Sequence, residues 1–278
     1  MAEITIYERD CVAGMRELLE PGSVDVVVTS PPYNLGIAYN THDDTAPREE
    51  YLAWCDTWAA EVKRVLSPGG SFFLNVGGKP TDPYVPFDVL GVMRRHFQLQ
   101  NVIHWIKSIA IMQDDVGRYP GLETDLMVGH YKPINSGRFV NDCHEYVFHL
   151  THRGDVPLDR LAIGVPYRDK SNVTRWKGAA RDVRCRGNTW YLPYPTILSR
   201  LRDRPHPASF PPALPDRCVR LHGAGRVKLA LDPFMGLGST AVACAQLGVA
   251  CAGFEIDPEY RAEALRRVAS VRAEVSAE

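Results

Sequence analysis

The sequence predicts an α/β fold with a doubly wound, mostly parallel sheet, and two stretches of the chain carry that prediction. The first is the apolar run from Val24 to Thr29, which is typical of a strand buried on both faces. The second is a strand at 227–231 that leads into Gly236 and Gly238, a helix, another strand and the carboxylate of Glu255. This order of elements is that of the nucleotide-binding half of a doubly wound fold.

Apolar runs and helical periodicity define the elements of the first 150 residues. Pro21-Gly22 and Pro68-Gly69-Gly70 are expected to end the elements that precede them. Residues 34–48 are polar and are expected to form a mobile loop, and residues 109–142 show no regular pattern. The expected elements are a strand at 4–7, a helix at 12–19, a strand at 24–28, a helix at 49–66, a strand at 71–76, a helix at 86–96, a strand at 101–107 and a strand at 145–150.

The last part of the chain follows a cluster of prolines at 205, 207, 211, 212 and 215, which is expected to lead back onto the main domain. A helix is expected at 241–247, ended by Gly248, and a second strand ends at Glu255. Asp257-Pro258 is typical of an N-cap followed by the first residue of a helix. Trp54, Trp58 and Trp105 are expected to be core residues.

The composition is that of a globular protein with one large domain, or with one domain and an insertion. The 278 residues are 45% hydrophobic, with no run of 18 apolar residues and no charged-then-apolar leader. A membrane span and a signal peptide are therefore not expected, and a cytoplasmic location is predicted. The seven cysteines form no C-x-x-C pair, which favours reduced structural thiols over disulfides or a metal site.

One segment of the chain is strongly basic although the net charge is only −1. Residues 151–205 hold 12 Lys and Arg against 5 Asp and Glu, a net charge of +7, so the remainder carries −8. Tyr167, Trp176, Trp190 and Tyr191 are interleaved with these arginines. Basic and aromatic residues mixed in this way indicate contact with phosphates and bases, and a solvated loop region is the open alternative.

The stretch Ser30-Pro31-Pro32-Tyr33 follows the buried strand directly, at the sheet edge where open α/β folds bind ligands. The two prolines fix the backbone and have no N–H to donate. The turn therefore offers carbonyl oxygens and the Ser30 hydroxyl as hydrogen-bond acceptors beside the Tyr33 ring. Such a turn suits a planar ring that carries an amine, although the tetrapeptide taken alone is more often an ordinary loop.

The glycine loop from Asp232 to Thr240 lets a ligand approach the backbone, and Glu255 lies at the offset expected for a carboxylate that binds ribose hydroxyls. A dehydrogenase would share the two glycines, but only 23 residues follow Glu255, too few for a second mononucleotide half unless the chain is permuted. Asp232 at the strand tip would repel a pyrophosphate and attract an ammonium group. A ligand with a ribose, an ammonium group and no phosphate describes S-adenosylmethionine.

Together these motifs resemble the β class of bacterial amino-methyltransferases, which methylate N4 of cytosine or N6 of adenine in DNA. In this class the catalytic turn precedes the cofactor loop, as it does here. The resemblance implies the S-adenosylmethionine-dependent methyltransferase fold, circularly permuted, with a small inserted target-recognition region. The matching stretches are Asp10-Cys11, Thr29 to Asn34, Arg64 to Gly70, Trp105 to Lys107, His144 to Tyr146, His206-Pro207, Phe210-Pro211, Asp232 to Thr240 and Glu255.

The resemblance also implies a role for each motif and a division of the chain into a catalytic half at 1–150, a target-recognition insertion at 151–205 and a cofactor-binding half at 206–278. The implied catalytic residues are Ser30, Pro31, Pro32 and Tyr33. The implied cofactor-binding residues are Asp10, Cys11, Phe210, Pro211, Asp232, Phe234, Gly236, Gly238, Ser239, Thr240 and Glu255. The expected DNA contacts are Arg168, Lys170, Arg175, Lys177, Arg181, Arg184 and Arg186.

The predicted function is site-specific methylation of double-stranded DNA at the N4 amine of cytosine, after the base has been flipped out of the helix. Serine at the first motif position is more common in the cytosine-N4 group of this class and aspartate in the adenine-N6 group, so adenine methylation stays open. Methylation of RNA or of a protein amide, and a non-catalytic nucleic-acid-binding module, are further alternatives. A second copy of the chain and a cognate restriction endonuclease stay open as partners.

Overall fold

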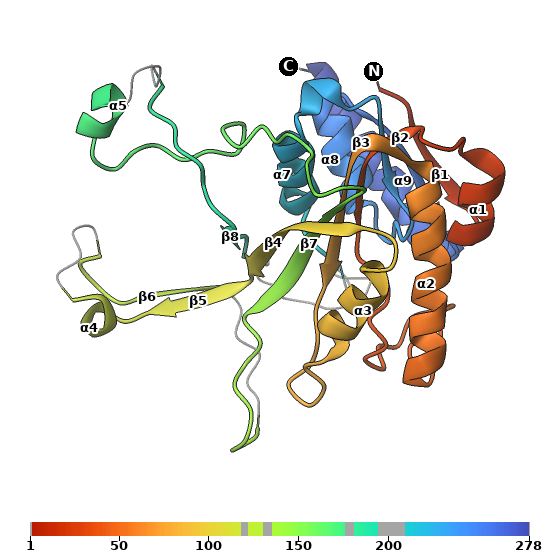
Figure 1. Cartoon of the computed structure of the whole chain (residues 1–278), viewed down its shortest axis with the longest axis horizontal. Helices are drawn as coiled ribbons and strands as arrows, with labels where there is room; N and C mark the ends of the chain where they lie inside the picture. Colours follow the sequence, from red (N-terminus) through yellow and green to blue (C-terminus); the bar gives the residue numbers. More distant parts are fainter. Residues whose placement is uncertain (1, 118–121, 130–134, 176–180, 194–208, 278) are drawn as a thin grey trace.

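An eight-stranded sheet forms the centre of the protein, with strands in the order β1-β10-β9-β2-β3-β7-β4-β8 (Figure 1). The structure is a computed structural model that describes residues 2–117, 122–129, 135–175, 181–193 and 209–277. All of these strands run in one direction except β7, which is antiparallel to its neighbours β3 and β4. The strands are β1 (Ile4–Glu8), β2 (Val24–Thr29), β3 (Leu66–Val76), β4 (Gln98–Ile106), β7 (His144–Thr151), β8 (Thr189–Tyr191), β9 (Leu229–Asp232) and β10 (Ala250–Glu255).

Helices cover both faces of the sheet, so two hydrophobic cores form. The strand β2 gives Val27 to one core and Val26 and Val28 to the other, so it is buried on both faces, as its valine run predicts. The first face carries α1 (Cys11–Leu18), α2 (Arg48–Val65) and α3 (Val85–Met93), and the second carries α7 (Ala213–His222), α8 (Ser239–Leu247) and α9 (Pro258–Ala277). The structure also has the short helices α4 (Gln113–Val116) and α5 (Ser171–Arg175) and a 3-10 turn at Ala224–Arg226.

Spatial order departs from chain order at the centre of the sheet. The strand β9, from the last part of the chain, lies between β10 and β2 and pairs with β2 in parallel, with Val27 opposite Leu231. Because parallel strands end at the same edge of a sheet, the turns after β2, β9 and β10 meet there. A ligand site is expected at this edge.

The helix α2 ends at Val65, before Pro68-Gly69-Gly70, as predicted, but no loop follows it. The strand β3, expected to start at Ser71, begins at Leu66 and runs through all three residues. The pairing register shifts between Val24 and Val26 of β2, so the extra residues of β3 form a bulge. A Cβ atom on Gly70 would lie 2.6 Å from the Leu66 side chain and 3.0 Å from the Asp25 carbonyl oxygen. The bulge thus requires glycine, which is why the sequence reads there as a loop.

Regular structure also occurs in two regions where none was expected. A hairpin of β5 (Ser108–Ile111) and β6 (Leu126–Gly129) lies in the region 109–142. The helix α7 starts within the proline cluster, with Pro212 at its N-cap and Pro215 in its first turn. Proline is compatible with that turn because the first N–H groups of a helix have no intrahelical partner.

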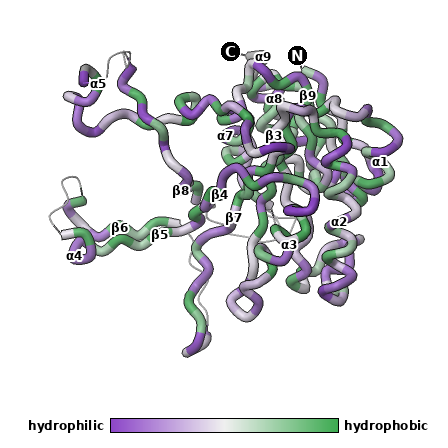
Figure 2. Tube along the Cα trace, viewed as in Figure 1, coloured by the Kyte–Doolittle hydropathy of each residue, from purple (hydrophilic) through white to green (hydrophobic). Residues whose placement is uncertain are grey.

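The β5–β6 hairpin and the chain around α5 project from the β4–β8 side of the sheet (Figure 1). Apolar residues follow both strands of the hairpin (Figure 2), and Met127 is 68% exposed. No helix within the described ranges is long and apolar enough to cross a membrane. All seven cysteines fall within those ranges and are free thiols.

Two of the three predicted core tryptophans, Trp58 and Trp105, are completely buried. The third, Trp54, is not: it is half-buried and reaches a pocket. The N-cap predicted at Asp257 is confirmed, since its carboxylate accepts the backbone N–H groups of Glu259 at 2.9 Å and Tyr260 at 3.0 Å.

Candidate functional site

A pocket opens at the carboxyl edge of the sheet, where the segments after β1, β2, β9 and β10 meet. The empty space within it, including solvent at the open mouth, is about 1000 Å³. Most of the predicted site residues line it, although they come from distant parts of the chain. Those that do are Asp10, Cys11, Ser30, Pro31, Pro32, Tyr33, Phe210, Phe234, Gly236, Ser239 and Glu255.

The Ser30-Pro31-Pro32-Tyr33 turn forms one wall of this pocket. The Tyr51 hydroxyl of α2 donates to the Pro32 carbonyl oxygen at 2.9 Å, which ties the turn to the helix. This hydrogen bond uses one lone pair of the Pro32 carbonyl oxygen. The turn is thus rigid, as the two prolines predict, and it presents Ser30 and Pro31 at the pocket wall.

The side chains of Ser30 and Tyr33 belong to a polar network at the ends of β2 and β3. The Ser30 Oγ atom lies 2.6 Å from the Tyr33 hydroxyl oxygen. The Asn75 side-chain nitrogen donates to the Tyr33 oxygen at 2.7 Å and lies 3.4 Å from Ser30 Oγ. Asn75 is only 1% exposed, so this network is closed to water on the side away from the pocket.

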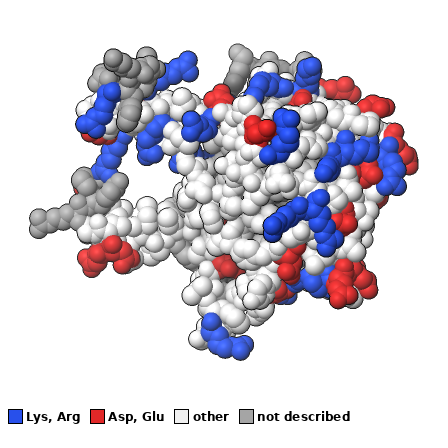
Figure 3. Space-filling model, viewed as in Figure 1, with Lys and Arg blue, Asp and Glu red and all other residues white. Residues whose placement is uncertain are grey.

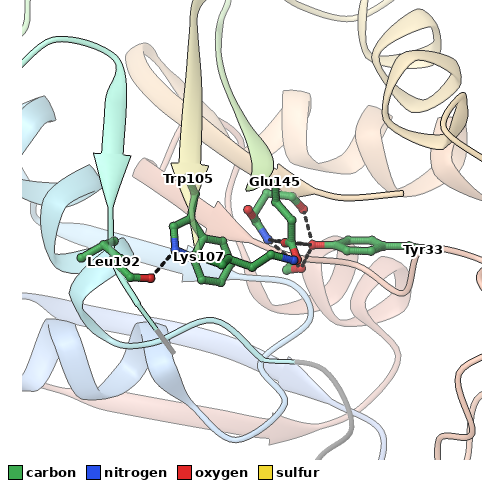
Figure 4. A network of polar contacts seen from close by, with 7 residues as sticks. Tyr33, Trp105, Lys107, Glu145 and Leu192 are labelled. Atoms are coloured by element: carbon green, nitrogen blue, oxygen red, sulfur yellow. Dashed lines mark hydrogen bonds and ion pairs between the residues drawn. The ribbon is translucent and has the colours of Figure 1, made fainter. Parts of the chain in front are cut away.

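A buried ion pair from β4 and β7 completes the network (Figure 4). Glu145 Oε2 accepts the Tyr33 hydroxyl at 3.1 Å and the Asn75 amide at 2.7 Å, and Glu145 Oε1 accepts Lys107 Nζ at 2.9 Å. Burial alone would raise the pKa of Glu145, but the Lys107 ammonium and the hydrogen bonds from Asn75 and Tyr33 outweigh it and lower the pKa. Glu145 is therefore an ionised carboxylate that accepts three donors.

Glu255, at the end of β10, lies close to the glycine loop. Its Oε2 accepts the Gly236 N–H at 2.7 Å and its Oε1 accepts the Asp257 N–H at 2.9 Å. Burial raises the pKa of this carboxyl above its ordinary value, against the lowering effect of the two N–H groups. The carboxylate thus holds the loop in shape while its remaining lone pairs face the pocket it lines.

Asp232 does not line the pocket surface, and its predicted attraction of a ligand ammonium stays a prediction. Its carboxylate is buried below the loop and accepts the Thr29 hydroxyl at 2.5 Å and the Thr240 hydroxyl at 2.7 Å. It also accepts the Phe234 N–H at 3.0 Å. Burial raises the pKa of Asp232 to about 6, despite these hydrogen bonds. Asp232 therefore joins β9, β2 and α8 and shapes the loop from beneath.

Gly238, Thr240 and Pro211 likewise do not line the pocket, and their predicted cofactor contacts stay predictions. A Cβ atom on Gly238 would lie 2.8 Å from the Cβ of Ala264, so this glycine allows α8 and α9 to pack closely. The Thr240 hydroxyl is engaged with Asp232. Phe210 does line the pocket, and its carbonyl accepts the Ser239 hydroxyl at 2.7 Å, which fixes the entry to α7.

The polar loop at 34–48 contributes pocket residues that the sequence did not indicate. Asp44 is 2% exposed and its carboxylate accepts the N–H groups of Asn34 at 2.7 Å, Leu35 at 3.0 Å and Ile37 at 3.0 Å. This buried carboxylate folds the loop around itself. The fold brings Tyr39, Thr41 and His42 to the pocket wall. A lone Asp in a polar stretch carries no signal of such a role.

Aromatic rings form a further part of the pocket wall that sequence reasoning missed. Trp54 of α2 lies with its ring centroid 5.3 Å from that of Phe234 in the glycine loop and 5.7 Å from that of His42. The helical spacing of Trp54 and Trp58 indicated only a core position. Trp54 follows Tyr51 on the same helix, so α2 supports both the turn and the aromatic wall.

The described residues hold no group of three His, Cys, Asp or Glu side chains that could bind a metal ion. Cys11 is a pocket residue, but burial raises the pKa of its thiol well above the ordinary value, with the neighbouring Asp10 adding to the effect. A thiol of this kind is a poor nucleophile and a poor ligand. Asp10 caps α1 by accepting the Ala13 N–H at 3.0 Å.

The predicted DNA contacts lie on the projecting arm around α5, where Figure 3 shows lysine and arginine side chains gathered. Exposed members are Arg168, Arg175, Arg181 and Arg184. Lys170 forms an ion pair with Asp182, and the half-buried Arg186 donates to the Ile163 carbonyl at 2.8 Å. Lys177 lies outside the described residues, as do Trp176 and His206-Pro207.

The aromatic residues of the basic segment are not all available to bases. Trp190 of β8 is 1% exposed and belongs to the core, so its expected contact with nucleic acid is corrected. The pairing of β8 with β4 is reinforced by Trp105, whose indole N–H donates to the Leu192 carbonyl at 2.8 Å (Figure 4). This part of the segment thus belongs to the sheet.

A family model named N6_N4_Mtase and described as DNA methylase matches residues 24–266, which is most of the chain. The chain belongs to this family. The matched region of the methylase runs from β2 into α9 and so contains the Ser30 turn, the Glu145 network, the glycine loop and Glu255.

Two relatives match the methylase over most of its length. M.HpaI, a Type II methyltransferase of Haemophilus parainfluenzae, is 27% identical over 253 residues, which cover 91% of this chain and 70% of the relative. M.ScaI, a Type II methyltransferase of Streptomyces caespitosus, is 28% identical over 267 residues, which cover 93% of this chain and 79% of the relative.

Solved structures share the fold of the methylase. The PvuII DNA methyltransferase, described as cytosine-N4-specific, superposes with a TM-score of 0.68 at 19% identity, covering 99% of this chain and 93% of that one. The complex of M1.HpyAVI with S-adenosylmethionine superposes with a TM-score of 0.56 at 18% identity, covering 95% and 99%. These likenesses confirm the predicted α/β fold of the S-adenosylmethionine-dependent methyltransferases.

Proposed function

We propose that this methylase transfers a methyl group from S-adenosylmethionine to the N4 amine of cytosine at specific sites in double-stranded DNA. The observation that carries the proposal is the meeting of the Ser30-Pro31-Pro32-Tyr33 turn with the glycine loop in one pocket. Methyl transfer to an amine needs acceptors for the amine beside a site for the methyl donor. M.HpaI and M.ScaI are Type II methyltransferases and the PvuII enzyme is cytosine-N4-specific, which supports this chemistry for the present chain.

The pocket fits S-adenosylmethionine, which supplies the methyl group. Glu255 uses one lone pair of each carboxylate oxygen for the N–H groups of Gly236 and Asp257, so lone pairs remain to accept ribose hydroxyls. Glu255 is half-buried at the pocket wall, where hydrogen bonds are stronger than in bulk water. M1.HpyAVI, a protein of the same fold, was solved with this cofactor.

The remaining cofactor contacts are assigned from the pocket wall. Asp10 and Cys11, which follow β1, would face the adenine, and Phe210 would close the methionine side. Asp232 would act indirectly, through the loop that it holds in shape.

The chain's own residues would activate the amine by positioning it. An aromatic exocyclic amine is a weak nucleophile because its lone pair is delocalised into the ring. The Ser30 hydroxyl and the Pro31 carbonyl would accept its two N–H groups and so localise the lone pair on nitrogen, while the Tyr33 ring stacks on the base. The Pro32 carbonyl is held by Tyr51 and does not compete. No strong base is needed, since the proton becomes acidic once the methyl group has transferred.

We assign residues 1–150 to a catalytic half, residues 206–278 to a cofactor-binding half and residues 151–205 to target recognition, in the circularly permuted order of the β class. In support, the turn after β2 precedes the loop after β9 in the chain although the two strands are neighbours in the sheet. Because β8 belongs to the sheet, target recognition would be confined to the projecting arm around α5.

Site-specific methylation implies double-stranded DNA as the partner, with the target base flipped out at a cost of a few kcal/mol. The exposed arginines of the arm would contact phosphates. The Type II relatives support a cognate restriction endonuclease as a second partner. Association with a second copy of the chain stays a prediction.

The test is to express the protein in a host that lacks DNA methylation and to analyse the nucleosides of its DNA by mass spectrometry. N4-methylcytosine is the expected product. If N6-methyladenine is detected and N4-methylcytosine is not, the target is adenine and not cytosine, which the family model covers equally. If the DNA is unmodified although calorimetry shows that the protein binds the cofactor, the substrate would be RNA or a protein amide.

A further inference from the structure

The hydrogen-bond network behind the turn contains more donors and acceptors than catalysis by Ser30 and Pro31 requires, and their arrangement has a direction. Ser30 Oγ and the Tyr33 oxygen lie 2.6 Å apart, and either hydroxyl could donate to the other. Which of them donates decides whether Ser30 offers the pocket a lone pair or a hydrogen. The neighbours of Tyr33 settle this choice.

The donors around Tyr33 are fixed by Asn75. The Asn75 side-chain nitrogen lies 2.7 Å from the Tyr33 oxygen and 2.7 Å from Glu145 Oε2, so its two hydrogens are directed to these two oxygens. The Tyr33 oxygen therefore accepts one hydrogen bond from Asn75. Asn75 is 1% exposed and has little freedom to rotate away.

The hydrogen of Tyr33 itself is directed by Glu145. Glu145 Oε2 lies 3.1 Å from the Tyr33 oxygen, and the other neighbour on that side, the Asn75 carbonyl oxygen at 3.2 Å, is also an acceptor. Tyr33 has one hydrogen, and Glu145 is an ionised carboxylate, which is a stronger acceptor than the neutral Ser30 hydroxyl, so the Tyr33 hydrogen is assigned to Glu145. Ser30 then donates its own hydrogen to the Tyr33 oxygen.

We propose that Glu145, held by Lys107, is a positioning residue that orients the Ser30 hydroxyl, so that Ser30 presents only lone pairs to the amine of the target base. A series of hydrogen bonds runs from the Ser30 O–H to the Tyr33 oxygen and from the Tyr33 O–H to the Glu145 carboxylate. It draws the Ser30 hydrogen away from the pocket before the substrate arrives. The inference rests on the proposed function, in which Ser30 accepts an N–H of the amine.

Lys107 makes this direction robust and gives the proposal a sharp variant. Lys107 has only donors and lies 2.9 Å from Glu145 Oε1. In Glu145→Gln the Lys107 ammonium takes the carbonyl oxygen of the new amide and turns its NH₂ group toward Tyr33. Tyr33 then faces an N–H donor in place of an acceptor, and the Asn75 N–H that Glu145 accepted loses its partner. Ser30 is no longer held with its hydrogen away from the pocket, although the substituted side chain has nearly the same size and shape.

The experiment measures single-turnover methylation, cofactor affinity and DNA affinity for Glu145→Gln, Ser30→Ala and the double variant. Glu145→Gln is expected to lower the transfer rate by about 10²-fold, comparable to the loss of one preorganised hydrogen bond, with both affinities changed by less than about 2-fold. In the Ser30→Ala background the same substitution is expected to change the rate by less than about 3-fold, because its effect passes through Ser30.

The matched control is Glu61→Gln, which removes a carboxylate buried to a similar degree and paired with Arg64 and Arg16 on α2 and α1, outside the pocket. It should leave the transfer rate as in the wild type. If Glu145→Gln does not fold, Tyr33→Phe cuts the same series of hydrogen bonds while keeping the ring, and a slowing that disappears in the Ser30→Ala background is again expected.

Equal slowing by Glu145→Gln in both backgrounds, or a wild-type rate, would overturn this inference and leave the proposed function intact. A wild-type rate in Ser30→Ala itself would instead overturn the role of Ser30 in the proposed function. The two failures are therefore distinguishable in one set of measurements.

Discussion

Ser30 and Glu255 lie in one pocket but on separate strands, Ser30 after β2 and Glu255 at the end of β10. Ser30 is tied to the polar network of Tyr33 and Glu145, whereas Glu255 is tied to the N–H groups of Gly236 and Asp257. These hydrogen bonds of Ser30 and of Glu255 involve different residues. Their contributions to turnover and to cofactor binding should therefore be separable.

We expect Ser30→Ala to lower kcat by at least about 10²-fold while the cofactor Kd changes little, since the lost acceptor acts on the amine. Glu255→Ala should weaken cofactor binding by roughly 1.5–3 kcal/mol, as expected for charged hydrogen bonds, with a smaller effect on kcat at saturation. Steady-state kinetics and calorimetry check both. A loss of cofactor affinity in Ser30→Ala would contradict the separation.

Asp232 should leave a signature in the pH dependence of stability. Its pKa is raised to about 6 in the folded protein, above the ordinary value of 3.8, so the folded state binds this proton more tightly than the unfolded state. The stabilisation from protonated Asp232 is present below pH 4 and is lost as the pH rises through about 6. Asp232→Asn should flatten the change in unfolding free energy between pH 4 and pH 6 by an amount on the order of 1–3 kcal/mol relative to wild type.

Chemical denaturation at several pH values measures this difference. Other carboxyl groups titrate in the same window, so the comparison is between Asp232→Asn and wild type and not within one curve. Parallel pH profiles for the two proteins would show that the carboxyl of Asp232 does not titrate as its burial requires.

The loop at 34–48 is the element whose shape depends most on a single side chain, because three of its N–H groups converge on the Asp44 carboxylate. Through this loop Asp44 supports Tyr39, Thr41 and His42 at the pocket wall, although it does not line the pocket itself. A single substitution at Asp44 should therefore disrupt the whole loop.

Asp44→Ala is expected to weaken cofactor binding by about 10-fold or more, since each unsatisfied N–H costs on the order of 1 kcal/mol or more and the loop should lose its shape. Its thermal midpoint should fall as well, by about 2–4 °C for each kcal/mol lost, because the three N–H groups lose their acceptor and Leu35 of the loop packs against the core. Proteolysis within 34–48 should accelerate. The neighbouring Asp43 is exposed, and its carboxylate accepts the N–H and hydroxyl of Thr45, so Asp43→Ala provides the matched control and should keep wild-type cofactor affinity.

The sequence could predict those parts of the site that follow strand ends directly. The Ser30 turn and the glycine loop each come after an apolar strand, and the rule that ligands bind at the carboxyl edge of such sheets brings them together. Glu145 and Lys107 also follow strand ends or lie near them, but their pairing depends on β7 running antiparallel beside β4. No local pattern encodes that neighbour.

The predictions from glycine were incomplete where the glycine allows close packing. Gly70 resembles a break yet fits a bulge against Leu66, and Gly238 resembles a ligand contact yet fits against Ala264. Asp44 and Trp54 show the converse, since their roles depend on which segments fold over them. Glycine and tryptophan alone do not say which neighbour requires them.

At the scale of the whole molecule, the charge is divided between an acidic body and the basic segment that holds the arm around α5. Counted along the chain, the segment at 151–205 carries +7 and the remainder −8, so the arm opposes the rest of the protein in sign. Figure 3 shows the basic side chains of the arm standing apart from the mixed surface of the body. An arm of this kind attracts a polyanion such as DNA, whereas the body does not. The charge distribution therefore favours binding of DNA in one orientation.

DNA affinity should therefore fall steeply with salt, and the slope should depend on the arm. Each neutralised phosphate contributes about 0.9 to the slope of log K against log salt, so losses of roughly 10³-fold or more between about 50 and 200 mM salt correspond to six or more contacts. Arg181→Ala and Arg184→Ala, at exposed arm positions, should each reduce that slope by about 1 and weaken binding to all sequences alike. Lys63→Ala, at an exposed position of α2 on the opposite side of the molecule from the arm, should leave the slope unchanged. A slope that responds equally to Lys63 and to the arm arginines would mean that DNA is held by the protein's general field and not by the arm.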